Sequence, residues 1–279
     1  MSIPTPNRRQ LLGGLATAVA GHKLASAASG RRAVVAIRLS DIDTREFLVD
    51  GSPLLVTSAT SRTSMGVHPS LGEVVRLFDT RTMAMLLEPT VGDTDRDYVR
   101  PGYSAPSWMM RAVGASPLNS KGKAFGLSSG LLLLTSARSA RAETPSTVVF
   151  PKTGIGRQLR QAAGLILGGG SQVQLFVASM GGAVTSGLAA AQTAGQLSHL
   201  AAAMTAFQRA MDLAGRASDV VVYTDPDRAG VAGRVRLVAG GSVIGGEVYS
   251  MSRQVSDRAL ESWAGFGQET VSGKNQFIY

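Results

Sequence analysis

The pattern of apolar and polar positions is clearest over residues 173–228, where two short apolar runs enclose a long helical pattern. Residues 173–179 and 220–223 are rich in strand-forming side chains. Between them, large apolar residues recur at spacings of 3, 4, 3 and 4, which places them on one helix face. These residues are Leu197, Leu200, Met204, Phe207 and Met211. The order strand, helix, strand predicts a βαβ unit with parallel strands.

The remaining pattern predicts further strands and helices around this unit. In chain order we expect a central strand at 34–39, a helix at 71–78, a strand at 83–87, a helix at 107–113, a hairpin within 121–136, an amphipathic helix at 153–166, two short strands around a glycine turn within 236–246, and a helix at 257–263. Neither an internal repeat nor a linker is visible. The fold class is therefore α/β: a three-layer sandwich with a mostly parallel central sheet, formed by residues 28–279 as one domain.

Several single residues mark the ends of these elements. Ser70 and Thr153 are suited to cap the helices that follow them. His68, which precedes a proline in a turn, is expected to have a structural role. The pair Gly181-Gly182 should let the chain leave the strand at 173–179 and turn sharply. Thr185 or Ser186 could then cap the long helix.

The N-terminus has the three parts of an export signal. Arg8 and Arg9 begin a twin-arginine motif, residues 11–21 are weakly apolar, and residues 25–27 are small enough for signal peptidase cleavage. Lys23, between the apolar part and the cleavage site, suits the twin-arginine route. We expect residues 1–27 to be a signal peptide and the mature protein to be periplasmic or secreted. The alternative is a basic, alanine-rich tail.

Composition narrows the classes of function. Hydrophobic residues make up 44% and charged residues 17% of the 279, which favours a folded core. Cysteine is absent, which excludes disulfides and thiol chemistry. Cleavage after Ala27 would remove three basic residues and no acid, so the formal charge of +9 would fall to +6. No basic cluster is interleaved with aromatic residues, so we expect no nucleic-acid partner. The positive net charge still allows an anionic ligand. The mature part holds no apolar run of transmembrane length.

Candidate ligand residues follow the apolar strands, because ligands of parallel sheets usually bind beyond the carboxyl ends of the strands. Asp43 follows the strand at 34–39, and Asp225, Asp227 and Arg228 follow the strand at 220–223. Asp43 can bind a metal ion or cap a turn, and the pattern favours the cap. For Asp225, Asp227 and Arg228, the pattern favours a turn with a local ion pair over a metal site.

The motifs resemble those of an exported bacterial family, the domain-of-unknown-function 1501 proteins. The resemblance rests on the twin-arginine signal, Gly-Val-His-Pro-Ser-Leu at 66–71, Phe-Val-Ala-Ser-Met-Gly-Gly at 176–182, and the alanine-rich helix that carries Ala206-Phe207. It covers most of the chain and is strongest over 150–249. It implies a fold like that of the alkaline phosphatase and sulfatase superfamily.

This sequence departs from the family where the family's acid and histidine ligands stand. The family has Phe-Asp-Thr-His after its glycine pair, whereas this chain has Ala183-Val184-Thr185-Ser186. The later histidine-bearing segment is missing between Arg228 and Arg236. The chain is therefore identified as a shortened, motif-eroded member.

The resemblance and its departures leave two functions open. The first is an exported, catalytically eroded protein with a binding or accessory role, without catalytic residues, cofactor or metal. The alternative is a hydrolase of phosphate or sulfate esters, in which carboxylates hold a divalent metal ion and Arg228 clamps the ester. Thr44 or Thr224 would be its nucleophile. Substrate, partner and oligomeric state do not follow from the sequence.

Overall fold

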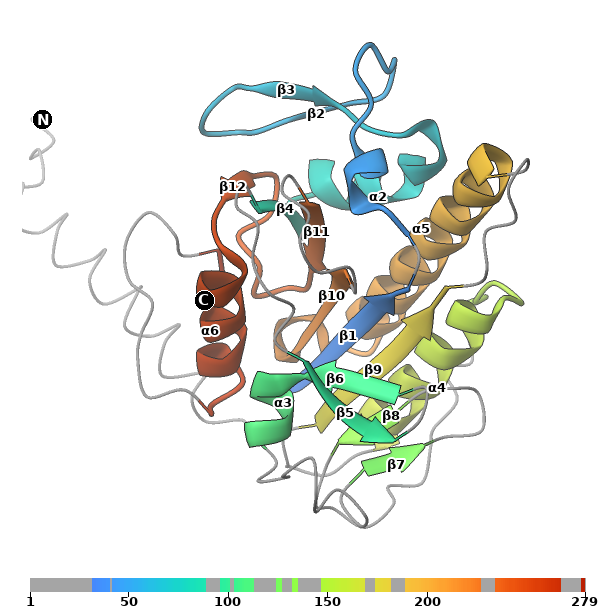
Figure 1. Cartoon of the computed structure of the whole chain (residues 1–279), viewed down its shortest axis with the longest axis vertical. Helices are drawn as coiled ribbons and strands as arrows, with labels where there is room; N and C mark the ends of the chain where they lie inside the picture. Colours follow the sequence, from blue (N-terminus) through green and yellow to red (C-terminus); the bar gives the residue numbers. More distant parts are fainter. Residues whose placement is uncertain are drawn as a thin grey trace, which may run out of the picture.

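The computed structural model describes residues 32–40, 42–88, 96–100, 103–112, 124–126, 132–134, 147–168, 174–181, 189–226, 234–266 and 277–278 (Figure 1). Its strands are β1 (Ala33–Leu39), β2 (Leu55–Thr57), β3 (Ser64–Gly66), β4 (Met83–Glu88), β5 (Arg96–Arg100), β6 (Tyr103–Pro106), β7 (Ala124–Gly126), β8 (Leu132–Leu134), β9 (Gln174–Met180), β10 (Val220–Pro226), β11 (Arg234–Ala239) and β12 (Val248–Ser250). Its α-helices are α2 (Gly72–Asp79), α3 (Ser107–Ala112), α4 (Gly154–Gly168), α5 (Ala189–Leu213) and α6 (Arg253–Trp263). Its 3-10 helices are η1 (Thr44–Phe47), η2 (Pro69–Leu71) and η3 (Ala217–Asp219).

The main sheet has eight strands in the order β12-β4-β11-β10-β1-β9-β8-β7. β1 lies between β9 and β10 and pairs parallel to both. Only β8 and β11 run against the other six strands, so the sheet is mixed but mostly parallel. The strands predicted at 34–39, 173–179 and 220–223 are therefore neighbours at the centre of this sheet. The α/β class with a mostly parallel sheet is confirmed.

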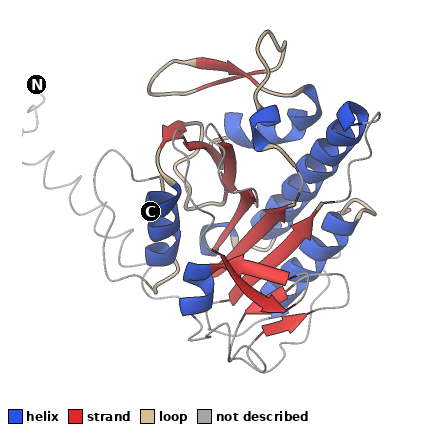
Figure 2. Ribbon diagram, viewed as in Figure 1, coloured by secondary structure: helices blue, strands red, loops and turns tan. Residues whose placement is uncertain are grey.

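β1 is apolar from residue 33 to residue 37 because both faces of the sheet are covered there. Ala33, Val35 and Ile37 belong to one core layer. Val34 and Ala36 belong to the other. All five are buried. Figure 2 shows helices on both sides of the sheet.

The helices α2, α4 and α5 cover the first layer. The predicted stripe of α5 is entirely buried there: Leu197, Leu200, Met204, Phe207 and Met211 are each 0% exposed. Gly215, with a φ of 66°, lies just beyond the end of α5. A residue in this left-handed conformation ends a helix, and glycine adopts it without strain.

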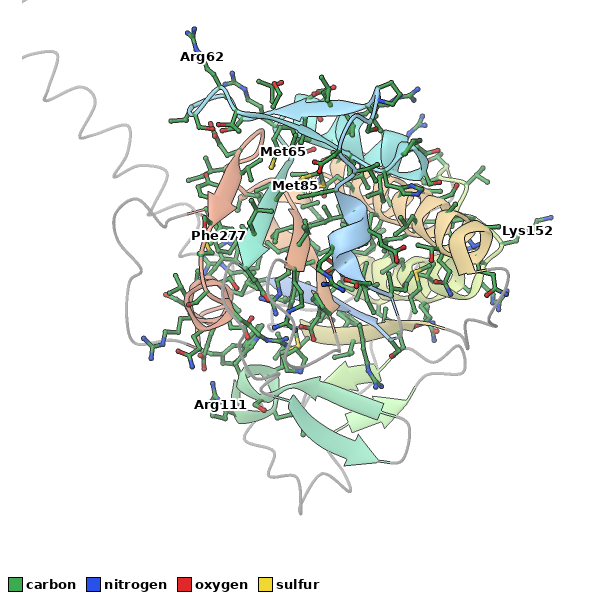
Figure 3. The ribbon with its side chains drawn as sticks, turned by 45° about the horizontal axis from the view of Figure 1, so that its top comes forward. Arg62, Met65, Met85, Arg111, Lys152 and Phe277 are labelled. Carbon is green, nitrogen blue, oxygen red and sulfur yellow. The ribbon has the colours of Figure 1, made fainter. Side chains whose placement is uncertain are left out.

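The helices α3 and α6 cover the second layer through Trp108, Leu260 and Trp263. Arg111 at the outer end of α3 (Figure 3) forms an ion pair with Glu261 of α6, with 3.8 Å between Nη2 and Oε2. This layer matters for the site because α6 begins beside the ends of β10 and β11, as described below.

A separate two-stranded hairpin, β2–β3, lies beside the main sheet (Figure 1). Met65 of β3 packs against the core layer to which Met85 of β4 belongs, and Figure 3 labels both residues. Arg62, near the tip, points away from the body. Glu247 anchors the turn, accepting hydrogen bonds of 2.5 Å from Ser58 and 2.6 Å from Thr60.

Helix starts agree with the sequence in one case and differ in another. Thr153 caps α4 as predicted, since its hydroxyl accepts from the Gly156 amide at 3.2 Å. The prediction for Ser70 is wrong. Its amide instead donates to Nδ1 of His68 at 3.1 Å, so the imidazole caps η2 and has a structural role. The α-helix proper begins only at Gly72.

Near the C-terminus the prediction of two strands within 236–246 is wrong. Only β11 forms, and Val243 makes no more than an isolated bridge to Ile278. The last helix also begins earlier than predicted, at Arg253, because Ser252 caps it by accepting from the Val255 amide. The predicted helix at 107–113 and the hairpin of β7 and β8 are present.

Candidate functional site

The carboxyl ends of β9, β1 and β10 lie side by side, so the predicted site can be traced residue by residue. The register places Arg38 of β1 opposite Asp225 of β10 on one side and Ser179 of β9 on the other. Gln158 of α4 holds Ser179, donating to its carbonyl at 2.9 Å and accepting from its amide at 2.7 Å. Within the described residues β8 pairs with β9 at 175–177, and Gln158 pairs with the β9 backbone two residues further on, at Ser179.

On the other side of β10, the strands β10 and β11 pair at two positions only, Val222 with Ala239 and Tyr223 with Val238. Two threonine hydroxyls then replace backbone carbonyls as acceptors. Thr224 accepts from the Leu237 amide at 2.9 Å, and Thr44 of η1 accepts from the Val235 amide at 3.2 Å. Both threonines are buried. Their hydroxyls therefore serve the backbone of β11.

An ion network lies next to these hydroxyls, and Asp225 is at its centre. The Asp225 side chain is 0% exposed. Its Oδ1 accepts from Nη2 of Arg236 at 2.9 Å and from Nη2 of Arg253 at 2.6 Å. Arg253 also donates to the Pro226 carbonyl at 3.3 Å. The end of β10 is thus bound both by its neighbour β11 and by the first turn of α6.

Glu88 at the end of β4 extends the network on the far side of β11. Its Oε1 lies 3.1 Å from Nε of Arg236, and its Oε2 lies 3.4 Å from Nε of Arg234. Within the described part of the chain neither Glu88 oxygen accepts a hydrogen bond of good geometry, although the side chain is buried. The contact is therefore mainly an attraction between charges.

Asp257, one turn into α6, completes the network. Its Oδ1 accepts from Nη1 of Arg236 at 2.7 Å, and its Oδ2 lies 3.5 Å from Nε of Arg253. Ser256 also accepts from Arg236, at 2.8 Å. Among the described residues the network contains three arginines and three carboxylates. These residues are Arg234, Arg236, Arg253, Glu88, Asp225 and Asp257.

The electrostatics of the network follow from its burial. Burial by itself lowers the pKa of Arg236, but the carboxylates of Asp257, Glu88 and Asp225 outweigh it and hold that pKa well above its ordinary value. Arg234 shows the opposite balance: burial lowers its pKa, and the attraction of Glu88 only partly opposes this.

Tyr223, on the strand beside the network, is also affected. Burial raises the pKa of its phenol, and the carboxylates of Asp225 and Asp257 add to the rise. The guanidinium of Arg236 stands over its ring, 5.4 Å from the centroid.

The predicted site residues have different places in the structure. Asp43 caps η1, accepting from the Arg45 amide at 3.1 Å, and pairs with the Arg45 guanidinium. This is the capping role that the pattern favoured. Asp225 lies in the ion network, inside β10, so the prediction that it stands in a turn after the strand is wrong. Asp227 and Arg228 lie outside the described residues, so their predicted roles stay predictions. Among the described residues no group of three or more acids and histidines is arranged to hold a metal ion.

The sequence did not identify Glu88, Arg234, Arg236, Arg253 or Asp257 as members of one cluster. A signal was present in β11, where Arg234 and Arg236 alternate with apolar residues and so point to the same face. Two arginines on one face of a buried strand require anionic partners. The sequence could not specify which acids these would be.

The glycine pair is only partly described. Gly181 passes close to β1: a Cβ atom there would lie 2.5 Å from the Ser40 carbonyl oxygen. Its φ is not positive, so close approach is the reason for glycine at this position. Gly182, Thr185 and Ser186 lie outside the described residues.

No family model matches the chain, and no curated protein matches it. Among the helices in the described ranges, none combines the length and the apolar character needed to cross a bilayer. The function is therefore inferred from the geometry of the strand ends.

Proposed function

We propose that this is an exported, catalytically eroded protein of the phosphatase and sulfatase-like type, with a binding or accessory role. In this proposal the strand ends that would hold catalytic metal ions carry a structural ion network instead. The proposal includes the twin-arginine export signal and the alkaline phosphatase-like fold that the sequence motifs suggest.

The observation that carries the proposal is the environment of Asp225. A strand-end carboxylate can bind a divalent cation only if its charge is available to that cation. Here two guanidinium groups donate to Asp225 Oδ1 at 2.9 and 2.6 Å, and the carboxylate is fully buried. A cation brought to the same place would be repelled by Arg236 and Arg253. Removal of either arginine would take away one of the cations that compensate the buried carboxylate, which is costly.

The threonines considered as nucleophiles support the same proposal. A nucleophilic hydroxyl needs a base within hydrogen-bonding distance. The hydroxyls of Thr44 and Thr224 instead accept hydrogen bonds from backbone amides of β11. In addition, Val184 and Ser186 stand where the family has an acid and a histidine.

Metal content and ester turnover together test the proposal. The purified protein is analysed for bound transition and alkaline-earth metals and is assayed with phosphate and sulfate esters, with Asp225→Asn as the matched control. We expect less than one tightly bound metal ion per chain and no turnover above that of the control. A stoichiometric metal ion, or turnover that the control loses, would establish the ester hydrolase instead.

A further inference from the structure

Positive charge gathers at the start of α4. Lys152, just before the helix, and Arg157 and Arg160, in its first two turns, are all exposed, and Lys152 points away from the body in Figure 3. The Arg157 guanidinium donates to the Lys152 carbonyl at 3.1 Å, which keeps these two residues together. The helix contains no acidic residue, and in the described part of the chain no carboxylate pairs with any of the three side chains.

Helix stability does not explain these cations. The N-terminus of a helix carries a partial positive charge, so acidic side chains stabilise it and basic ones do not. Arg157 and Arg160, three positions apart, also repel each other on one side of the helix. The neighbouring helix α5 has a single acid, Asp212, at its C-terminal end. That end lies beside the end of α4, because Arg216 donates to the Ile166 carbonyl at 3.4 Å. The charge at the start of α4 therefore suits an anionic partner.

An apolar side chain stands out next to this charge. Val148 and Phe150 pack against the first core layer, whereas Val149 between them is 91% exposed. Because both of its neighbours are anchored, the valine is held outward. It precedes Lys152 by three residues, which is at most about 11 Å along the chain. An apolar side chain among basic ones suits the boundary between the head groups and the acyl chains of a bilayer.

We infer that the start of α4 is a contact site for an anionic lipid bilayer. In this contact Lys152, Arg157 and Arg160 lie against lipid phosphates, which guanidinium groups bind through paired hydrogen bonds, and Val149 enters the head-group region. The inference goes beyond the proposed function and does not rest on it. The helix α4 covers the first core layer, whereas the ion network lies beside Tyr223, a residue of the second.

Cosedimentation of the whole chain with vesicles measures the contact. Vesicles of equal parts phosphatidylcholine and phosphatidylglycerol are compared with phosphatidylcholine alone. The test variant carries Arg157→Gln and Arg160→Gln. The control variant carries Arg62→Gln and Arg258→Gln, which remove the same charge from exposed positions on other elements. All the proteins share residues 1–27, so differences between them arise from the substitutions.

We expect the natural protein to bind the anionic vesicles and to bind them less at high salt. The test variant should bind them about 25-fold more weakly, because each basic side chain near an anionic surface strengthens binding about fivefold. The control variant should lose much less.

A tryptophan probe tests the orientation of the bound protein. The two natural tryptophans, Trp108 and Trp263, are buried. The emission of Val149→Trp should therefore gain a blue shift on anionic vesicles. Leu55→Trp, at an exposed apolar position of the β2–β3 hairpin, should show none.

Three results would overturn the inference. The first is equal binding of the test and control variants to the anionic vesicles. The second is a blue shift at position 55 and none at position 149. The third is binding of the natural protein to soluble polyglutamate but not to the vesicles, which would assign the site to an acidic polypeptide. None of these measurements involves metal content or ester turnover, so the inference and the proposed function can fail separately.

Discussion

The Nη2 atom of Arg253 donates a 2.6 Å hydrogen bond to Oδ1 of Asp225, 28 residues earlier in the chain. This bond ties the first turn of α6 to the end of β10. At the other end of α6, Arg32, the residue before β1, donates to the Trp263 carbonyl, and its guanidinium lies 5.3 Å from the centroid of the indole. The helix is thus held at both ends by arginine contacts with the sheet, and its position depends on charges as well as apolar packing.

Replacement of Arg236 by methionine should destabilise the protein by about 3–5 kcal/mol, because buried carboxylates lose their shared cation. Methionine keeps much of the side-chain volume, so the loss reflects charge more than packing. Urea unfolding measures the difference. The matched control is Arg258→Met, an exposed arginine of α6, which should change the stability by less than about 0.5 kcal/mol. Equal effects of the two substitutions would contradict a structural role for the network.

Tyr223 should make the protein sensitive to alkali. Its pKa is raised in the folded state, mainly by burial, whereas the unfolded side chain ionises near its ordinary value of about 10. The folded state therefore keeps a proton that the unfolded state loses. The contribution of Tyr223 to the free energy of unfolding is therefore constant below pH ~10. Above that pH it falls by up to about 1.4 kcal/mol per pH unit.

The measurement is urea unfolding between pH 8 and 11, with Tyr223→Phe as the control. The Tyr223 hydroxyl has no hydrogen-bond partner within the described ranges, so its removal should cost little at pH 7. The phenylalanine variant should also lose less stability above pH 10 than the natural protein. Identical slopes in the two proteins would show that Tyr223 does not carry the effect.

Gln158→Ala should destabilise the protein by about 1–3 kcal/mol, because the amide and carbonyl of Ser179 lose the side chain that pairs with both. Amide hydrogen exchange gives a local readout: Ser179 should exchange faster in the variant. Arg160→Ala, an exposed position of the same helix, should leave that exchange unchanged. Protection of Ser179 that survives the loss of Gln158 would refute this assignment.

Two glycine-to-alanine substitutions should have opposite effects. At Gly181 the new Cβ would lie 2.5 Å from the Ser40 carbonyl oxygen and 2.7 Å from the Ser40 Cβ, which should destabilise the fold by about 1–3 kcal/mol. At Gly195, within α5, a Cβ meets nothing within 4 Å, and alanine should stabilise the helix by about 0.5–1 kcal/mol. A comparison of the two Tm values with that of the natural protein decides the point. A Tm for Gly181→Ala at or above the natural value would show that β1 and β9 are not so close.

The elements with strong local periodicity could be predicted from the pattern of residues. The stripe of α5 and the apolar run of β1 were correctly predicted because burial on one face or on both leaves a direct mark on residue spacing. The second strand expected within 236–246 was wrongly predicted because so short a run has no periodicity to read. A short apolar run such as that at Val243 and Ile244 looks the same whether it pairs as a strand or packs in a turn.

The surroundings of Asp225 depend on how distant parts of the chain pack together. The sequence pattern predicts it in a turn after the strand, whereas it lies inside β10 (Val220–Pro226). The arginines that bind it, Arg236 and Arg253, lie 11 and 28 residues further along the chain. Arg236 reaches Asp225 because β11 inserts between β10 and β4, running against both. Arg253 reaches it because α6 packs on the second core layer. Strand order and helix docking depend on packing across the whole chain, and local sequence spacing carries no record of which opposite charges they bring together.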